Sequence, residues 1–101
     1  MEQKFKRAPA TYRKISGIKP EQDIRVRLLG RVIGKSDGMI VIDDGSSRAN
    51  IVTEETDAGI NDIVRVFARV LPLESGFELR AELVQKMEKL DMDLYNKIFG
   101  D

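Results

Sequence analysis

Histidine and cysteine are both absent from the 101 residues of this chain. Without cysteine it can form neither a disulfide nor a thiolate metal site, and without histidine it lacks the commonest general base and transition-metal ligand. Any catalysis would therefore rest on carboxylates, lysines or hydroxyls. No apolar run reaches the roughly 18 residues of a membrane span, and the N-terminus is too polar for a signal peptide. We expect a soluble, intracellular protein.

The net charge is zero, but the charges are unevenly distributed along the chain. Residues 1–35 contain ten Lys and Arg against three Asp and Glu, whereas residues 36–101 contain seven against fourteen. A basic front half suits a polyanionic ligand, and an acidic back half suits a protein partner or serves solubility. The length and the 42% hydrophobic content predict one domain with a single small core.

Alternation of apolar and other residues predicts three antiparallel strands between Ile24 and Val52. The expected elements are, in order, a strand at Ile24–Ile33, a hairpin loop at Gly34–Gly38, a strand at Met39–Asp43, a turn at Asp44-Gly45 and a strand at about Arg48–Thr53. In the first strand, the phase that contains Ile24, Val26, Leu28 and Val32 is predicted to face the core. Gly30 predicts a bulge or a sharp bend, which lets one strand serve two halves of a closed barrel.

Two further strands and a helix complete the expected fold. A charged linker at Glu54–Asn61 precedes a fourth strand at Asp62–Leu71, and a turn at Pro72–Gly76 leads to a fifth at Phe77–Gln85. Five strands with the break after the third follow the order of an OB-fold barrel. Asp91 can cap a C-terminal helix over Met92–Phe99. The sequence thus predicts an all-β, five-stranded OB-fold barrel with a C-terminal α-helix, divided into a basic arm (1–18), the barrel (19–86) and the helix (87–101).

The predicted helix carries two apolar rows, which is more than one barrel surface can easily cover. The first row contains Leu90, Leu94 and Ile98, and the second contains Met92, Tyr95 and Phe99. One row is expected to close the end of the barrel, and the other is expected to meet a partner.

Cationic side chains on the outward face of the sheet are candidates for nucleic-acid contact. OB barrels that bind single strands combine cations along the phosphates with flat side chains that stack on the bases. The candidates are Arg25, Arg27, Arg31, Arg48 and Asn50 on the first three strands, Lys35 in the first hairpin loop, and Phe67 in the outward phase of the fourth strand. The alternative interpretation is that the arginines are ordinary solvated neighbours and that Phe67 is covered by a loop or a partner. Aromatic residues are only 6% of the chain.

No catalytic, metal or cofactor site is expected. Asp43-Asp44 and Glu54-Glu55 are paired acids, but adjacent strand residues point to opposite faces, and the first pair also fits a turn. The stretch Gly30–Ser36 (GRVIGKS) lacks the glycine spacing of a phosphate-binding loop. We therefore expect a binding protein and not an enzyme.

Five segments taken together resemble the smallest subunit of replication protein A in its archaeal form. They are RAPATYRKISGI (7–18), LLGRVI (28–33), IDDGS (42–46), VRVFARV (64–70) and LDMDLY (90–95). The resemblance covers nearly the whole chain and implies an OB barrel with a C-terminal helix, without a catalytic centre.

The same resemblance implies a role in replication, repair and recombination of DNA within a heterotrimer. The partners would be single-stranded DNA and the middle and large subunits, and the protein would be cytoplasmic and associated with the nucleoid. The interface residues would be those of the helix rows: Leu90, Met92, Leu94, Tyr95, Ile98 and Phe99. The alternative function is an OB-fold scaffold that contacts mainly proteins.

Overall fold

The computed structural model describes residues 9–87, which contain six strands and one 3₁₀ turn. In chain order the elements are β1 (Thr11–Tyr12), η2 (Ile15–Gly17), β2 (Arg25–Ser36), β3 (Met39–Asp43), β4 (Arg48–Val52), β5 (Ile63–Pro72) and β6 (Phe77–Met87). The expected C-terminal helix, with its two apolar rows, lies outside the described residues. No helix within residues 9–87 has the length and hydrophobicity to cross a membrane.

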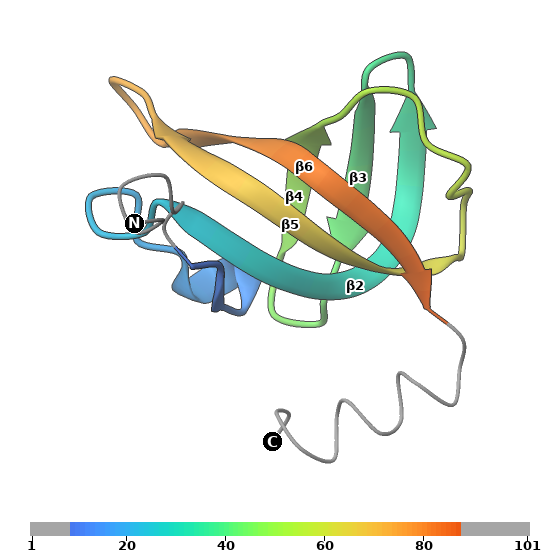
Figure 1. The fold of residues 1–101 in the computed structure, drawn as a ribbon, viewed down its shortest axis with the longest axis horizontal. Helices are drawn as coiled ribbons and strands as arrows, with labels where there is room; N and C mark the ends of the chain where they lie inside the picture. Colours follow the sequence, from blue (N-terminus) through green and yellow to red (C-terminus); the bar gives the residue numbers. More distant parts are fainter. Residues whose placement is uncertain (1–8, 88–101) are drawn as a thin grey trace, which may run out of the picture.

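The strands form a closed barrel, because β2 pairs with β5 over its first part and with β3 over its second (Figure 1). Residues 25–31 of β2 pair antiparallel with β5, and residues 31–36 pair antiparallel with β3. The sheet order is β1-β2-β3-β4-β6-β5, and the additional β2–β5 pairing completes the circle. The predicted barrel of five strands is confirmed. The two-residue β1 is an addition, and it pairs parallel to β2.

Gly30 lies at the bend where β2 passes from one neighbour to the other. A Cβ atom at this position would lie 2.9 Å from the backbone oxygen of Asp43 and 3.2 Å from its carbonyl carbon. Both contacts are to backbone, which cannot rotate away as a side chain can. The bend predicted at Gly30 is therefore present. The bulge falls further along the strand, where the register shifts between Val32 and Gly34.

The core is made by the inward phase of the strands, joined by residues from two connecting segments. Side chains of the strands that are at most 5% exposed are Val26, Leu28, Val32, Ile40, Ile42, Ile51, Val64, Val66, Ala68, Val70 and Leu79. Ile15 and Ile18 join them from the N-terminal segment, and Ala58 joins them from the linker after β4. The packed unit therefore includes residues that the sequence assigned to the N-terminal arm, and β6 continues to Met87, one residue into the range assigned to the helix.

Three apolar residues lie on the opposite side from the one their alternation predicts. Ile24, expected inside, is 59% exposed because it precedes β2 at the end of the barrel. Leu83 shares the alternation phase of Phe77 and Leu79, which puts it inside, but it is 47% exposed because the register between β5 and β6 shifts by one residue at Glu82. Leu29 belongs to the outward phase but is buried, since it lies beside the bend in a cleft with Ile33 and Ile63.

Two aspartates fasten the N-terminal segment to the barrel. Asp23 accepts hydrogen bonds from the Arg13 guanidinium, at 3.0 and 3.1 Å, and from the Lys19 N–H, at 2.8 Å. The hydrogen bond from Arg13 lowers the pKa of Asp23, although burial of the carboxyl opposes this effect. Asp44 accepts a 2.7 Å hydrogen bond from the Ile15 N–H with one oxygen, and its other oxygen accepts bonds from Ser46 and Ser47.

These bonds also fix the ionisation of Asp44. Partial burial raises the pKa of Asp44, but the hydrogen bonds from Ile15, Ser46 and Ser47 outweigh it, so the net pKa lies below the ordinary value. The carboxylate form is therefore the one that holds the turn after β3 and the start of η2 together.

The close contact at Gly30 yields a stability prediction. Gly30→Ala should lower the free energy of unfolding by about 1–3 kcal/mol, because the added methyl group must displace the backbone of Asp43. Urea unfolding followed by circular dichroism measures this change. Gly17→Ala is the matched control, because a Cβ there meets no atom within 4 Å and its φ is not positive. Equal stabilities of the two variants would contradict this account of the bend.

Asp44 yields a prediction for the dependence of stability on pH. Its folded pKa is below its unfolded pKa, so its contribution is full above the unfolded value and is lost as the pH falls through the folded one. Asp44→Asn should lower the free energy of unfolding at pH 7 by about 1–2 kcal/mol, a modest value because the carboxylate is partly open to water.

The same variant should lose less stability than the wild type between about pH 5 and pH 2. Urea titrations at a series of pH values check both expectations. Asp57→Asn serves as the control, since Asp57 is exposed and has no hydrogen bond or ion pair with the described residues. A parallel pH profile for Asp44→Asn and the wild type would refute the assignment.

Candidate nucleic-acid interface

The bend in β2 divides the predicted nucleic-acid-binding residues between two faces of the barrel. Arg25 and Arg27 lie on the half of β2 that pairs with β5, and Arg27 is directly opposite Phe67. Arg31 lies at the junction, opposite Ile63 of β5 on one side and Asp43 of β3 on the other, and Asp43 is in turn opposite Arg48 of β4. Asn50 belongs to this second face, where it is exposed. The structure thus does not bring the predicted set together on one surface.

The larger basic surface is the outer side of β2, β5 and β6, which we call the β2–β5–β6 face. Its residues form four rows across the strands. The rows are Arg25, Arg69 and Arg80; Arg27, Phe67 and Leu83; Leu29, Arg65 and Gln85; and Arg31, Ile63 and Met87. Six of these twelve positions are arginine. Sequence reasoning missed Arg65, Arg69 and Arg80 as site residues, although alternation had placed all three in outward phases.

Two carboxylates partly neutralise the β2–β5–β6 face. Glu82 forms an ion pair with Arg25, and Glu78 pairs with Arg80 at 2.6 Å. Arg69 lies between Arg25 and Arg80 in the same row, is exposed, and has no hydrogen bond or ion pair with residues 9–87. The face therefore keeps an excess of positive charge, with an exposed guanidinium at the centre of its first row.

Phe67 occupies the middle of the β2–β5–β6 face. Its ring is half-buried, and the guanidinium carbon of Arg65 lies 5.6 Å from the ring centroid. Arg65 is itself held by Gln85, whose side-chain oxygen accepts bonds from Nε at 2.9 Å and Nη2 at 2.7 Å. The ring is thereby braced on one side by a fixed cation and adjoins the exposed Leu83 on the next strand.

The outer side of β3 and β4, which we call the β3–β4 face, is different in character. Its residues are Met39, Val41, Asp43, Arg48, Asn50 and Val52. Arg48 and Asp43 form a 3.3 Å ion pair, so their charges cancel. The six side chains include no aromatic ring.

Lys35 lies in β2, and not in the hairpin loop where the sequence placed it. β2 continues to Ser36, which leaves Asp37-Gly38 as a two-residue turn with Gly38 at φ 76°. The Lys35 Nζ donates 2.8 Å hydrogen bonds to the backbone oxygens of Thr56 and Ala58. Its ammonium group therefore ties the linker after β4 to the barrel, which gives this residue a structural contact.

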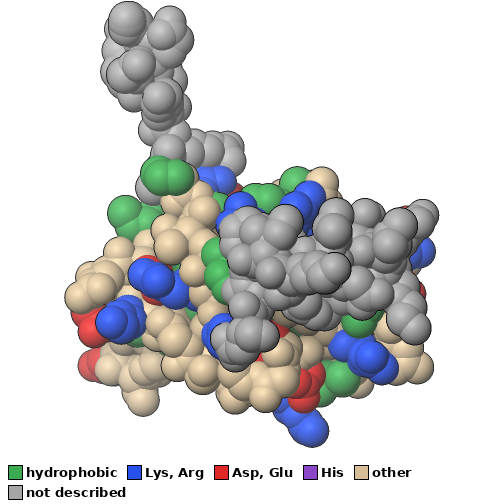
Figure 2. Space-filling model, turned by 90° about the horizontal axis from the view of Figure 1, so that it is seen from below, with side chains coloured by type: hydrophobic (Ala, Val, Ile, Leu, Met, Phe, Trp, Pro, Cys, Tyr) green, Lys and Arg blue, Asp and Glu red, His purple; other side chains and the backbone are tan. Residues whose placement is uncertain are grey.

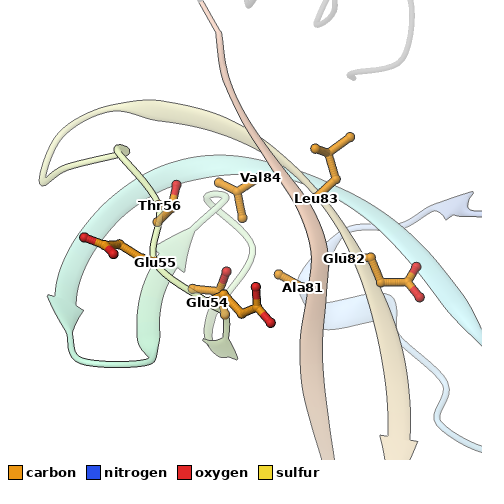
Figure 3. A pocket seen from close by; sticks show the side chains of 8 residues that line it. Glu54, Glu55, Thr56, Ala81, Glu82, Leu83 and Val84 are labelled. Carbon is orange, nitrogen blue, oxygen red and sulfur yellow. The ribbon is translucent and has the colours of Figure 1, made fainter.

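The two pairs of adjacent acids, Asp43-Asp44 and Glu54-Glu55, lie at a turn and at a cleft respectively. Asp43 accepts a bond from the Gly45 N–H at 2.7 Å, as expected for turn chemistry. Glu54 and Glu55 lie in a cleft of about 530 Å³ between the linker and residues 81–84 of β6 (Figure 3). Within residues 9–87, no three acidic side chains are grouped closely enough to hold a metal ion.

The surface view agrees with a distributed arrangement of charge. On the face drawn in Figure 2, Lys and Arg side chains stand in several separate groups, with hydrophobic and acidic side chains also scattered over the surface.

Comparisons with known proteins identify the fold. No family model and no curated protein sequence matches this chain. Among solved structures, the OB domain of a Thermoplasma acidophilum protein aligns with a TM-score of 0.59 at 20% identity, over 76% of this chain and 87% of that one. The fold is the OB fold.

Two further OB-type neighbours align over almost the whole chain. The telomere capping protein Ten1 from Saccharomyces pombe gives a TM-score of 0.69 at 19% identity, covering 89% of this chain and 93% of that chain. A chain of U. maydis replication protein A, in a structure bound to single-stranded DNA, gives 0.62 at 17% identity, covering 95% and 100%. At these identities the similarity establishes the fold and its extent.

Proposed function

We propose that this protein is a non-enzymatic, single-stranded-DNA-binding subunit of a replication protein A-like complex that acts in replication, repair and recombination. The observation that carries the proposal is the β2–β5–β6 face, where six arginines share a surface with the ring of Phe67 and, within residues 9–87, Glu78 and Glu82 pair with two of them. Phosphates need cations and bases need flat apolar surfaces, and this face supplies both.

The shape of the molecule supports the same proposal. OB barrels commonly bind oligonucleotides, and a neighbour of nearly equal extent is a chain of replication protein A in a complex with single-stranded DNA. The sequence resemblance points to the same class, and it covers the segment 90–95 beyond the barrel as well as the barrel itself. In this assignment the protein works inside the cell at the nucleoid, with a middle and a large subunit as partners.

Binding of the full chain to fluorescent oligo-dT tests the function. Each phosphate contact contributes a slope of about −0.7 to a plot of log K against log salt for single strands. With two to four contacts, the slope should lie between about −1.4 and −2.8. Fluorescence anisotropy at 25 to 200 mM salt, with double-stranded DNA of equal length for comparison, measures it. An absence of binding at the lowest salt would favour the alternative function, a scaffold that contacts mainly proteins.

Assembly through the C-terminal residues is the second part of the proposal. Leu94→Asp would place a charge in the row formed by Leu90, Leu94 and Ile98, and burying that charge in an interface is strongly unfavourable. If this row faces a partner, the variant should remain folded by circular dichroism, elute as a monomer and fail to co-purify with the partner subunits. If the row packs on the barrel, the fold itself should weaken.

Asn96→Asp is the matched control for this variant. It introduces the same negative charge two residues after Leu94, at a position that belongs to neither apolar row. Normal co-purification of Leu94→Asp would exclude this row as the interface, whereas loss of assembly in both variants would indicate a general effect of negative charge.

A further inference from the structure

We propose that the bound single strand lies across the β2–β5–β6 face, over Phe67, and not on the β3–β4 face that OB domains ordinarily use. This inference rests on the proposed function and names the surface that performs it. It also assigns contact roles to Arg65, Arg69 and Arg80, which the sequence did not single out.

The charges of the two faces favour this assignment. Arg31 borders both faces. The other five arginines of the β2–β5–β6 face stand against Glu78 and Glu82 within residues 9–87, whereas on the β3–β4 face the charges of Arg48 and Asp43 cancel. A polyanion is attracted to the surface that retains positive charge after its internal ion pairs are counted. The face used by other OB domains therefore offers this ligand little attraction in the present chain.

The arrangement of side chains also favours it. Phe67 has Arg27 directly opposite on β2, and Arg65 and Arg69 are its neighbours on the same side of β5. Adjacent strands are about 4.8 Å apart, so a base stacked on the open side of the ring has Arg27 and Arg69 within reach of its flanking phosphates. The Arg65 guanidinium lies over the ring itself and is held by Gln85. Leu83, 47% exposed on β6, extends the apolar surface toward a second base. The β3–β4 face offers no equivalent ring.

The row of Arg25, Arg69 and Arg80 also supports binding on the β2–β5–β6 face. Like charges directly opposite each other on neighbouring strands destabilise a sheet. Glu82 and Glu78 relieve the two outer arginines, but Arg69 in the centre has no anionic partner among residues 9–87. A phosphate group placed over this row would supply the missing anion. A bound phosphate, and not the fold itself, would then explain why three arginines share this row.

Matched charge reversals in the full chain separate the two faces. Arg69→Glu and Arg48→Glu each reverse one exposed arginine on a strand, so neither should disturb the core. Arg69→Glu should weaken oligo-dT binding at least tenfold and make the salt slope shallower by about 0.7, the value of one phosphate contact. Arg48→Glu should change the affinity by less than about twofold, as expected for a charge already paired on a face that the strand does not touch.

Phe67 is tested by a variant that keeps an apolar side chain. Phe67→Leu should weaken binding by about tenfold, within the range found for the loss of one base stack, while the unfolding temperature stays close to that of the wild type. Photo-crosslinking of the wild type to iodouracil-containing oligonucleotides gives a readout without mutation. The crosslinked peptide should contain residues of β5 or β6.

The outcomes distinguish this inference from the function on which it rests. If the wild type binds no oligonucleotide at low salt, the proposed function is overturned. If it binds, but Arg48→Glu weakens it and Arg69→Glu does not, or crosslinks fall on β3 and β4, the function stands and the assignment to the β2–β5–β6 face is overturned. If Arg69→Glu and Phe67→Leu weaken binding and Arg48→Glu does not, the proposed function and the assignment to the β2–β5–β6 face are both supported.

Discussion

The course of β2 is the constraint on which the barrel and both candidate faces depend. A single strand of twelve residues pairs with β5 over its first half and with β3 over its second. This is possible only where the backbone bends tightly, and the contact between Gly30 and the backbone of Asp43 leaves no space for a side chain at that point. The same bend turns the outward side chains of β2 in two directions. Arg25 and Arg27 thereby join one surface, while Arg31 lies at the junction of the two.

Pairing across the barrel also changes the meaning of the charge distribution. The sequence separates into a basic front half and an acidic back half, which suggests a ligand for one half and a partner for the other. In the fold, β2 from the front half lies beside β5 and β6 from the back half. The most basic face is therefore built from both halves, with Arg65, Arg69 and Arg80 coming from the acidic one. The distribution of charge along the sequence therefore did not predict its distribution over the faces of the barrel.

The fold was largely predictable, and the exceptions have local causes. Alternation identified the inward residues of β5 correctly, and the bounds of β3 were predicted without error, because period-two patterns and glycine turns are strong signals. Leu83 was misplaced because a one-residue register shift reverses every side chain beyond it. Lys35 was assigned to the hairpin loop because no signal in the sequence indicated that β2 continues past the register shift to Ser36. Its bonds to the carbonyls of Thr56 and Ala58, some twenty residues away, follow no local pattern either. The division of the predicted arginines between two faces likewise follows from long-range pairing, which alternation within one strand does not report.

The barrel separates the residues that hold the fold from those available to a ligand. Stability comes from the inward phase of each strand and from carboxylates at the turns, where Asp23 and Asp44 accept hydrogen bonds from the N-terminal segment. The outward phase of β2, β5 and β6 contributes few of these contacts, so its composition is not dictated by packing. In the row of Arg25, Arg69 and Arg80, Glu82 and Glu78 relieve the two outer arginines, but Arg69 in the centre has no carboxylate partner within residues 9–87, and repulsion from its neighbours opposes folding. Local choices that conflict with stability are expected at functional sites. By that criterion the row through Arg69, next to the ring of Phe67, is the part of this surface that folding alone does not explain.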